Sequence, residues 1–366
     1  MKTRSSPRLC VSRTVSRCTR GPAGVLLTTL ALGLGLGVAS PALGEPTPAP
    51  RPAGPEVSPV RGALPAGRSE ESLAVKGIYL QKSTVLDGKR LQDLIEGAKL
   101  AGFNTFVVDI KGRSPEYAAA IKTIQDAGLR FVPRVTMFPG GASREQMADR
   151  GLLERRWAVV NYALELGAKD IQLDYIRFSS RNTPSDENSS KVREVLRTIG
   201  QRVHERGARL QIDVFGEVSY GPSLRIGQDM RVFAPELDAV CPMLYPSHFE
   251  PYKETAKKPY ETVHGALVAM ARQIQAHPIP MYPYIEHFNY RHRMSADERA
   301  AYFEAQLEAV LRSDAQGFYL WSVGNYYEIP FSVLARRAQE RRAAGPLAGG
   351  PTTSGGVARS SDATVD

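Results

Sequence analysis

The sequence predicts an α/β protein whose main domain is a (β/α)₈ barrel of the TIM type. Across residues 73–342, short apolar segments rich in β-branched residues alternate with longer amphipathic segments, and eight such pairs can be counted. Strict alternation implies a parallel sheet with right-handed crossovers. Eight units favour a closed barrel over an open sheet.

The pattern assigns each unit a place in the chain. The expected strands cover residues 75–80, 103–110, 129–138, 170–178, 209–216, 237–245, 279–286 and 316–323. The expected helices cover 87–102, 115–128, 152–167, 187–207, 225–236, 259–277, 295–317 and 331–342. Several of these helical segments end in Gly, as helices that re-enter a sheet often do.

The two ends of the chain differ in composition from the barrel. Residues 1–44 contain six basic and no acidic residues, followed by the apolar run 25–40, and this pattern predicts a signal peptide cleaved near residues 42–44. We therefore expect a secreted, periplasmic or cell-envelope protein without stable membrane insertion after cleavage, and an uncleaved anchor is the alternative. Residues 45–72 read as a Pro- and Ala-rich linker, and residues 343–366 as a disordered tail.

Charge and cysteine content narrow the function classes. The net charge of +9 falls when residues 1–44 are set aside, because 41 basic and 38 acidic residues remain. This near balance gives no electrostatic support for a nucleic-acid partner. Only Cys241 remains outside the expected signal peptide, so no internal disulfide is expected, and its apolar surroundings favour a small buried side chain over a nucleophile. The sequence carries no signal for an oligomeric state.

The stretch "DIQLDYIRF" places Asp174 at the carboxyl end of the fourth expected strand. A buried carboxylate without a partner costs several kcal/mol, so this one is either paired structurally, with Arg134 or Lys111, or faces a functional cavity. In barrels of this kind the active site lies at the carboxyl ends of the strands. The period of two turns Gln172 and Ile176 inward together with Asp174.

The same alternation brings further polar and aromatic residues to strand ends. They are Asp109, Lys111, Arg134, Asp213, Glu217, Tyr245, His248, Tyr284, Glu286 and Trp321. Aromatic rings and carboxylates suit a carbohydrate groove, because sugars present apolar C–H faces and hydroxyl groups. Glycoside cleavage needs two carboxyl groups, one ionised and one that holds a proton.

In combination, several segments resemble a bacterial glycoside hydrolase family first catalogued as a domain of unknown function. They are "VKGIYL", "FNTFVVDIKG", "IQLDYIRF", "IDVFGE", "IGQDM", "CPMLYPSHF" and "GFYLWSVGNYY". The resemblance implies a (β/α)₈ barrel distantly similar to the α-amylase-like hydrolases. It places Asp174 at the strand-four nucleophile and Glu217 near the position of the acid. The residue after "DVFG" is often not acidic in the family, so Asp213 and Glu286 remain rivals for the acid.

The sequence as a whole predicts an exported glycoside hydrolase that cleaves a polysaccharide without a cofactor. Asp174 is the expected nucleophile or charge stabiliser, and the general acid is Glu217, Asp213 or Glu286. The expected substrate-binding residues are Asp109, Lys111, Arg134, Arg177, Tyr245, His248, Tyr284 and Trp321. Two alternatives stay open. One is a non-catalytic barrel that binds glycan at the cell surface. The other is a metal-dependent deacetylase that uses His248 and His287, although no HExxH motif or comparable ligand spacing is present.

Overall fold

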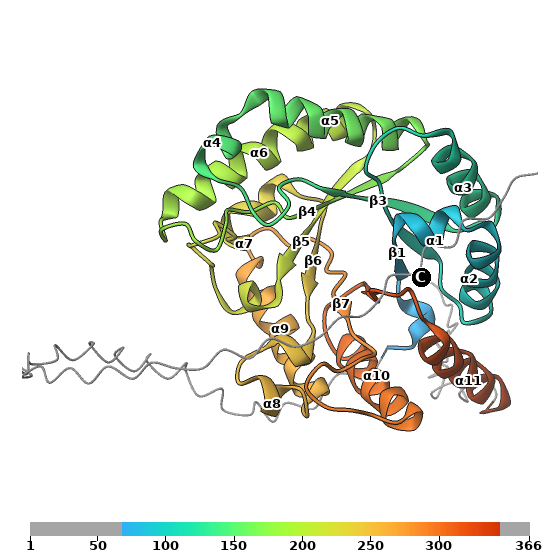
Figure 1. Ribbon diagram of the computed structural model, residues 1–366. Coiled ribbons are helices and arrows are strands. Elements are labelled where there is room, and N and C mark those ends of the chain that lie inside the picture. Colours follow the sequence, from blue (N-terminus) through green and yellow to red (C-terminus); the bar gives the residue numbers. More distant parts are fainter. Residues whose placement is uncertain (1–67, 345–366) are drawn as a thin grey trace, which may run out of the picture. The chain divides into compact units, whose positions relative to one another are not determined.

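The computed structural model describes residues 68–344 (Figure 1). The expected signal peptide, most of the expected linker and all but the first residues of the expected tail lie outside the described residues. Within residues 68–344, no helix combines the length and the apolar character that a membrane crossing requires.

The predicted closed barrel is confirmed. Eight strands, every neighbouring pair of them parallel, follow one another around the barrel in chain order, and β8 closes onto β1. The strands are β1 (Val75–Leu80), β2 (Thr105–Asp109), β3 (Arg130–Thr136), β4 (Asp170–Asp174), β5 (Arg209–Phe215), β6 (Ala239–Met243), β7 (Tyr284–Ile285) and β8 (Gly317–Leu320).

Helices connect the strands and form the outer layer seen in Figure 1. They are α1 (Lys82–Leu86), α2 (Gly88–Leu100), α3 (Pro115–Asp126), α4 (Arg144–Ala148), α5 (Arg150–Glu165), α6 (Asp186–Glu205), α7 (Met230–Phe233), α8 (Tyr252–Thr255), α9 (Pro259–Gln273), α10 (Ala296–Leu311) and α11 (Glu328–Ala344). Short 3₁₀ segments are η1 (Glu70–Ser72), η2 (Gly216–Tyr220), η3 (Ala234–Glu236) and η4 (Pro246–His248). The expected helix 225–236 is reduced to α7 and η3.

Two separate apolar clusters follow from the alternation along the strands. Outward residues such as Ile78, Phe106 and Leu173 pack with the helices. A smaller cluster fills the barrel, and its members are Val75, Tyr79, Val107, Val132, Ala239, Cys241, Tyr282, Tyr284 and Tyr319. Gly77 makes room for this filling, because a Cβ atom there would lie 2.6 Å from the ring of Tyr319. The barrel is therefore a packed core with its polar face at one end.

Seven of the eight strands are shorter than expected, and for β4 and β7 the difference has a local cause. β4 ends at Asp174 because Tyr175 adopts φ = 54° and turns the chain. Ile176 therefore packs in the outer cluster, and its predicted inward orientation is wrong. β7 keeps only two residues because Pro280 and Pro283 lack the N–H groups that a ladder requires.

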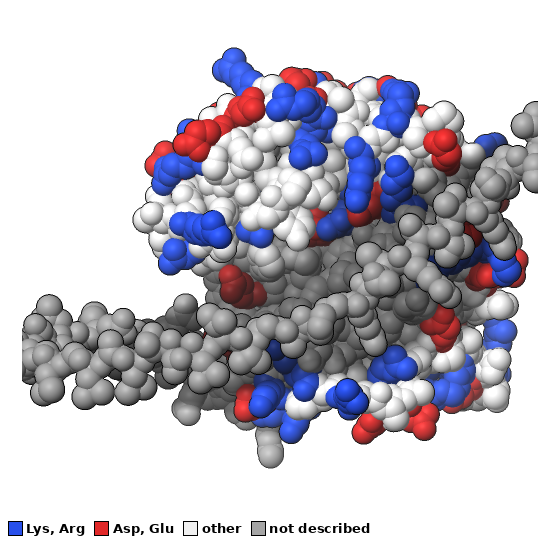
Figure 2. Space-filling model, viewed as in Figure 1, with Lys and Arg blue, Asp and Glu red and all other residues white. Residues whose placement is uncertain are grey.

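Charged side chains lie on the outer layer. Figure 2 shows Lys and Arg intermixed with Asp and Glu around the rim of the described part, on the face viewed in Figure 1. This distribution agrees with the near balance of basic and acidic residues outside residues 1–44.

Candidate active site

Four ionisable side chains meet at the carboxyl ends of β2 to β5. The guanidinium group of Arg134 contacts Asp109 through Nη1 and Asp174 through Nη2, and its Nε lies 3.5 Å from Asp213 Oδ2. The sheet register explains this meeting, because Asp109 pairs with Arg134 across β2 and β3. We call Asp109, Arg134, Asp174 and Asp213 the acidic cluster.

The acidic cluster holds more negative than positive groups. The exposed fractions of its side chains run only from 2% for Asp213 to 15% for Arg134. Three ionised carboxylates around one buried guanidinium would leave an excess of two negative charges in a region of low dielectric. The cluster therefore favours keeping one carboxyl group protonated.

The surroundings of Asp213 favour its protonated form. Burial raises the pKa of Asp213 well above its usual range, repulsion from Asp174 raises it further, and Arg134 opposes these effects. Its Oδ1 atom is buried and has no hydrogen-bond partner among the described residues. Asp109 and Asp174, in contrast, each accept a further hydrogen bond, from Tyr79 Oη at 2.7 Å and from the Tyr175 backbone N–H respectively.

Asp174 and Asp213 lie next to each other on neighbouring strands. The last register pair between β4 and β5 is Leu173 with Ile212, and the two aspartates are the next residues of their chains. Neighbouring strands run about 5 Å apart, and both carboxyl groups contact the same guanidinium. The two carboxyl groups therefore lie close together, and a pair of neighbouring carboxyls is what glycoside cleavage requires.

Aromatic rings form a continuous wall from the acidic cluster to the surface. The Trp321 ring centroid lies 6.4 Å from that of Tyr79, 6.1 Å from that of Tyr245 and 5.7 Å from that of Phe288. Phe288 in turn contacts Tyr290, which is 58% exposed, and Tyr245 contacts His248. We call Tyr79, Tyr245, His248, Phe288, Tyr290 and Trp321 the aromatic wall.

Sequence reasoning missed three members of this wall. Tyr79 shares the inward parity of Val75 in β1 and stands one residue before the strand end, so the period of two could have identified it. Phe288 and Tyr290 follow β7 in a loop, where no periodicity fixes the direction of a side chain. Tyr245, His248 and Trp321 were expected in the groove, and the structure brings them together.

A polar layer lies inside the barrel, on the β-strand residues that precede the acidic cluster. Tyr284 Oη donates to Gln172 Oε1 at 2.8 Å, Tyr319 Oη donates to Gln211 Oε1 at 3.1 Å, and Cys241 Sγ lies 3.0 Å from the same Gln211 oxygen. Tyr284 is 2% exposed, so it belongs to the floor of the site. Burial raises the pKa of the Cys241 thiol, which keeps it protonated and inert, as expected.

Glu286 lies outside the acidic cluster. Its carboxylate accepts hydrogen bonds from the Ser247 backbone N–H at 2.8 Å, Ser247 Oγ at 2.9 Å and Tyr302 Oη at 2.7 Å, and it is fully buried. The side chain thus ties β7 to η4 and α10. Its parity with Tyr284 predicted an inward direction, but the alternation stops where the two-residue strand ends.

Glu286 makes folding depend on pH. Burial raises the pKa of Glu286 from its ordinary value of 4.5 to about 7, against the effect of its three donors. Between these values the unfolded chain releases a proton that the folded protein retains, so stability is lost as pH rises. We expect the stability of the wild type relative to Glu286→Gln to fall by about 2–3 kcal/mol between pH 5 and pH 8.

Urea denaturation of both proteins at the two pH values measures this difference. The buried His287, whose pKa burial lowers to about 4, is present in both proteins and cancels in the comparison. A stability difference that is the same at pH 5 and pH 8 would show that Glu286 is ionised in the folded protein.

The other sequence candidates lie at the periphery. Glu217 is exposed in η2 and accepts a hydrogen bond from Ser223 Oγ at 3.0 Å. Lys111 is exposed, and its side chain makes no hydrogen bond or ion pair with another described residue. Across residues 68–344, no three His, Cys, Asp or Glu side chains group as a metal ion requires, so His248 and His287 belong to no such set.

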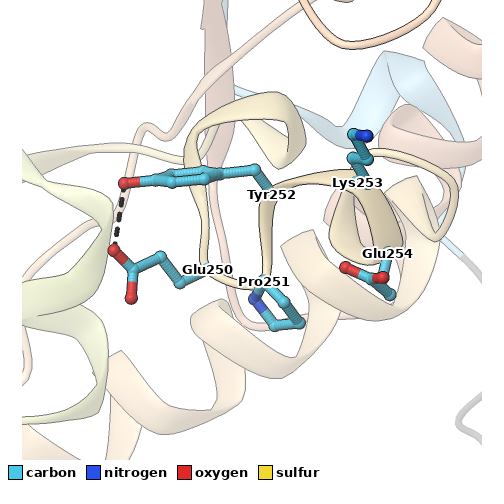
Figure 3. Close-up of a pocket in the computed structure, with 5 residues that line it drawn as sticks. All are labelled: Glu250, Pro251, Tyr252, Lys253 and Glu254. Carbon is cyan, nitrogen blue, oxygen red and sulfur yellow. Dashed lines mark hydrogen bonds between the residues drawn. The ribbon is translucent and has the colours of Figure 1, made fainter.

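An open pocket of about 520 Å³ lies beside η4 (Figure 3). Five consecutive residues, Glu250 to Glu254, line it, and the Tyr252 hydroxyl donates to Glu250 at 3.0 Å. This hydrogen bond raises the pKa of Tyr252, and the charge of Glu217 adds to the effect.

The fold and the paired carboxyls define the class of barrel glycosidases. Residues 145–327, half of the chain, match the family model described as "Putative glycosyl hydrolase domain". The chain belongs to this family, and the protein is an enzyme of the glycosidase type. The matched region includes Asp174 and Asp213, whereas Asp109 and Arg134 precede it.

Solved structures show the same fold at low sequence identity. The Bacillus cereus spore cortex-lytic enzyme SleL is 14% identical with a TM-score of 0.53, over 71% of this chain and 73% of that chain. A class V chitinase from Pseudomonas fluorescens Pf-5 is 15% identical with a TM-score of 0.52, over 71% and 98%. The endo-β-1,4-mannanase from Thermotoga petrophila is 11% identical with a TM-score of 0.53, over 76% and 79%. No curated protein sequence matches the chain.

Proposed function

We propose that the protein is an exported hydrolase that cleaves glycosidic bonds within a polysaccharide. The observation that carries this proposal is the pair of neighbouring carboxyls around Arg134, of which Asp174 is ion-paired and Asp213 is buried with a raised pKa. Support for the sugar substrate comes from the aromatic wall beside the pair, and from the family. Support for export comes from the composition of residues 1–44.

The proposed reaction uses the two carboxyls in complementary roles. Asp213 gives its proton to the glycosidic oxygen as the bond from that oxygen to the anomeric carbon breaks. Asp174, ion-paired with Arg134, stabilises the positive charge that develops on the sugar ring. A water molecule then adds its hydroxyl group to the anomeric carbon and returns a proton to Asp213.

Hydrolysis of a panel of polysaccharides by the purified protein tests the proposed function. We expect new reducing ends from at least one polymer and none after boiling the protein. The competing function is a non-catalytic glycan-binding barrel, which has no need for a protonated carboxyl beside an ionised one. Tight binding of a polymer that stays uncleaved would support that competitor.

The role of Asp213 has its own test. A general acid contributes about 10²- to 10⁴-fold, so Asp213→Asn should slow polysaccharide hydrolysis by that factor. An aryl glycoside with an acidic phenol needs no proton to leave, so its cleavage should change little. The Glu217→Gln and Glu286→Gln variants should lack this contrast between the two substrates.

The pH profile gives a second reading of the same role. Since the pKa of Asp213 is raised, the activity of the wild type should fall as pH rises and Asp213 releases its proton. If Glu217→Gln, and not Asp213→Asn, slows polysaccharide hydrolysis while it leaves cleavage of the aryl glycoside unchanged, Glu217 is the general acid.

A further inference from the structure

Arg177 lies near the acidic cluster, in a position that its neighbours define. It follows β4 by three residues and is half-buried, with its guanidinium carbon 5.3 Å from the Tyr175 ring centroid and 5.1 Å from that of Phe215. Gly141 leaves the space for it, because a Cβ atom there would lie 2.7 Å from Arg177 Nη1. The left-handed φ of 95° at Gly141 also favours glycine at this position.

The guanidinium group of Arg177 makes few hydrogen bonds within the described part of the protein. Nη1 donates to the Phe178 carbonyl at 2.9 Å, while Nε and Nη2 make no hydrogen bond with a described residue. No carboxylate of residues 68–344 forms an ion pair with it, in contrast to Arg134, which contacts three. A half-buried cation without a counter-charge is costly, and burial accordingly lowers the pKa of Arg177.

The charge of the whole site explains what Arg177 can attract. With Asp213 protonated, the acidic cluster carries two negative charges and one positive charge, so its net charge is −1. Arg177 brings the site to neutrality, and the field of Asp174 reaches it without direct contact. A substrate group that approaches Arg177 therefore meets a positive charge that no described carboxylate covers.

We propose that Arg177, together with Tyr175 and Phe215, forms a subsite for a sugar that carries a carboxylate. The planar fork of an arginine matches the two oxygens of a carboxylate, and Nε and Nη2 remain available for such a bidentate contact. Phe215 is 37% exposed and offers its ring to the C–H face of the same sugar. This inference rests on the proposed function and names its substrate class as acidic polysaccharides.

A matched pair of substrates isolates the carboxylate. A uronic-acid polymer and the same polymer with its carboxyl groups reduced to primary alcohols share backbone and linkage and differ only in charge. The second pair starts from glycan strands that carry no peptides and whose sugars bear a carboxylate on an ether-linked lactyl group. Its other member is the same glycan with those carboxylates reduced to alcohols. We expect the wild type to favour the carboxylated member of one pair by about 10- to 100-fold in kcat/KM, and the responsive pair identifies the source of the carboxylate.

Variants of Arg177 assign the preference to the residue. Arg177→Gln should lower kcat/KM by about 10- to 100-fold on the carboxylated polymer, mainly through KM, and by less than about threefold on the reduced one. Arg177→Lys keeps the charge without the fork and should fall between. Arg181→Gln changes an exposed residue of the same loop and is the control. It should leave kcat/KM unchanged on both substrates.

Binding measured by calorimetry separates this inference from the proposed function. Carboxylated oligosaccharides that bind through Arg177 but are never cleaved would contradict the proposed hydrolase function and support the subsite. If the wild type cleaves both members of each pair equally, the proposed subsite is wrong but the protein is still a hydrolase. The same holds if Arg177→Gln lowers kcat/KM equally on both members.

Discussion

The Asp174→Asn variant is expected to lose at least about 10³-fold in the rate of polysaccharide hydrolysis. Asparagine keeps the shape of the side chain and can still accept the hydrogen bond from the Tyr175 backbone N–H. It lacks the negative charge that stabilises the developing cation, and a loss of about 4 kcal/mol in transition-state stabilisation corresponds to that factor. The rate of release of reducing ends measures the effect.

The control is Asp186→Asn, which removes the same charge from an exposed position in the first turn of α6. Its activity should stay close to that of the wild type. An aryl glycoside with an acidic phenol should not rescue Asp174→Asn, because ring stabilisation is needed whatever the leaving group. An Asp174→Asn variant that keeps full activity would remove Asp174 from the mechanism.

Replacement of Arg134 by methionine is expected to destabilise the folded protein by about 3–5 kcal/mol at pH 7. Among residues 68–344, Arg134 is the cation that forms ion pairs with Asp109, Asp174 and Asp213, and all three pairs would be lost. Urea denaturation at pH 7 measures the change.

Arg134→Lys retains the positive charge but cannot reach three carboxyls with one planar group, so its stability should fall between those of the wild type and Arg134→Met. An Arg134→Lys variant that is as unstable as Arg134→Met would show that the charge of Arg134 is not the cause of the loss. The electrostatic account of the acidic cluster would then be wrong.

Much of the fold and part of the site could be predicted from the sequence, because both depend on periodicity. Eight alternating segments predicted the barrel, and the period of two predicted that Asp109, Arg134, Asp174 and Asp213 face its interior. These side chains meet at one end of the barrel because neighbouring parallel strands are paired in register. The similar lengths of adjacent segments largely determine that register.

The remaining features depend on tertiary structure. No local pattern shows that burial raises the pKa of Asp213 well above its usual range. The left-handed backbone at Tyr175 ends β4 early and turns Arg177 toward Phe215, and tyrosine rarely adopts that conformation. The prediction for Glu286 extended strand alternation beyond a strand that two prolines shorten.

The proposed general acid shows the same limit of sequence reasoning. Glu217 was favoured because it follows β5 at a family-like position, whereas the structure leaves it exposed beside Ser223. Asp213, four residues earlier, lies within the acidic cluster. The sequence held both candidates, and only their surroundings separate them.

The protonation of Asp213 can be observed directly by carbon-13 NMR of protein labelled at the aspartate carboxyl carbon. This label excludes Glu286, so every signal belongs to an aspartate. The account predicts one carboxyl signal at pH 7 with the chemical shift of a protonated acid, absent in Asp213→Asn and retained in Glu286→Gln. A spectrum in which all aspartate carboxyls are ionised at pH 7, or in which the protonated signal disappears only in Asp174→Asn, would contradict it.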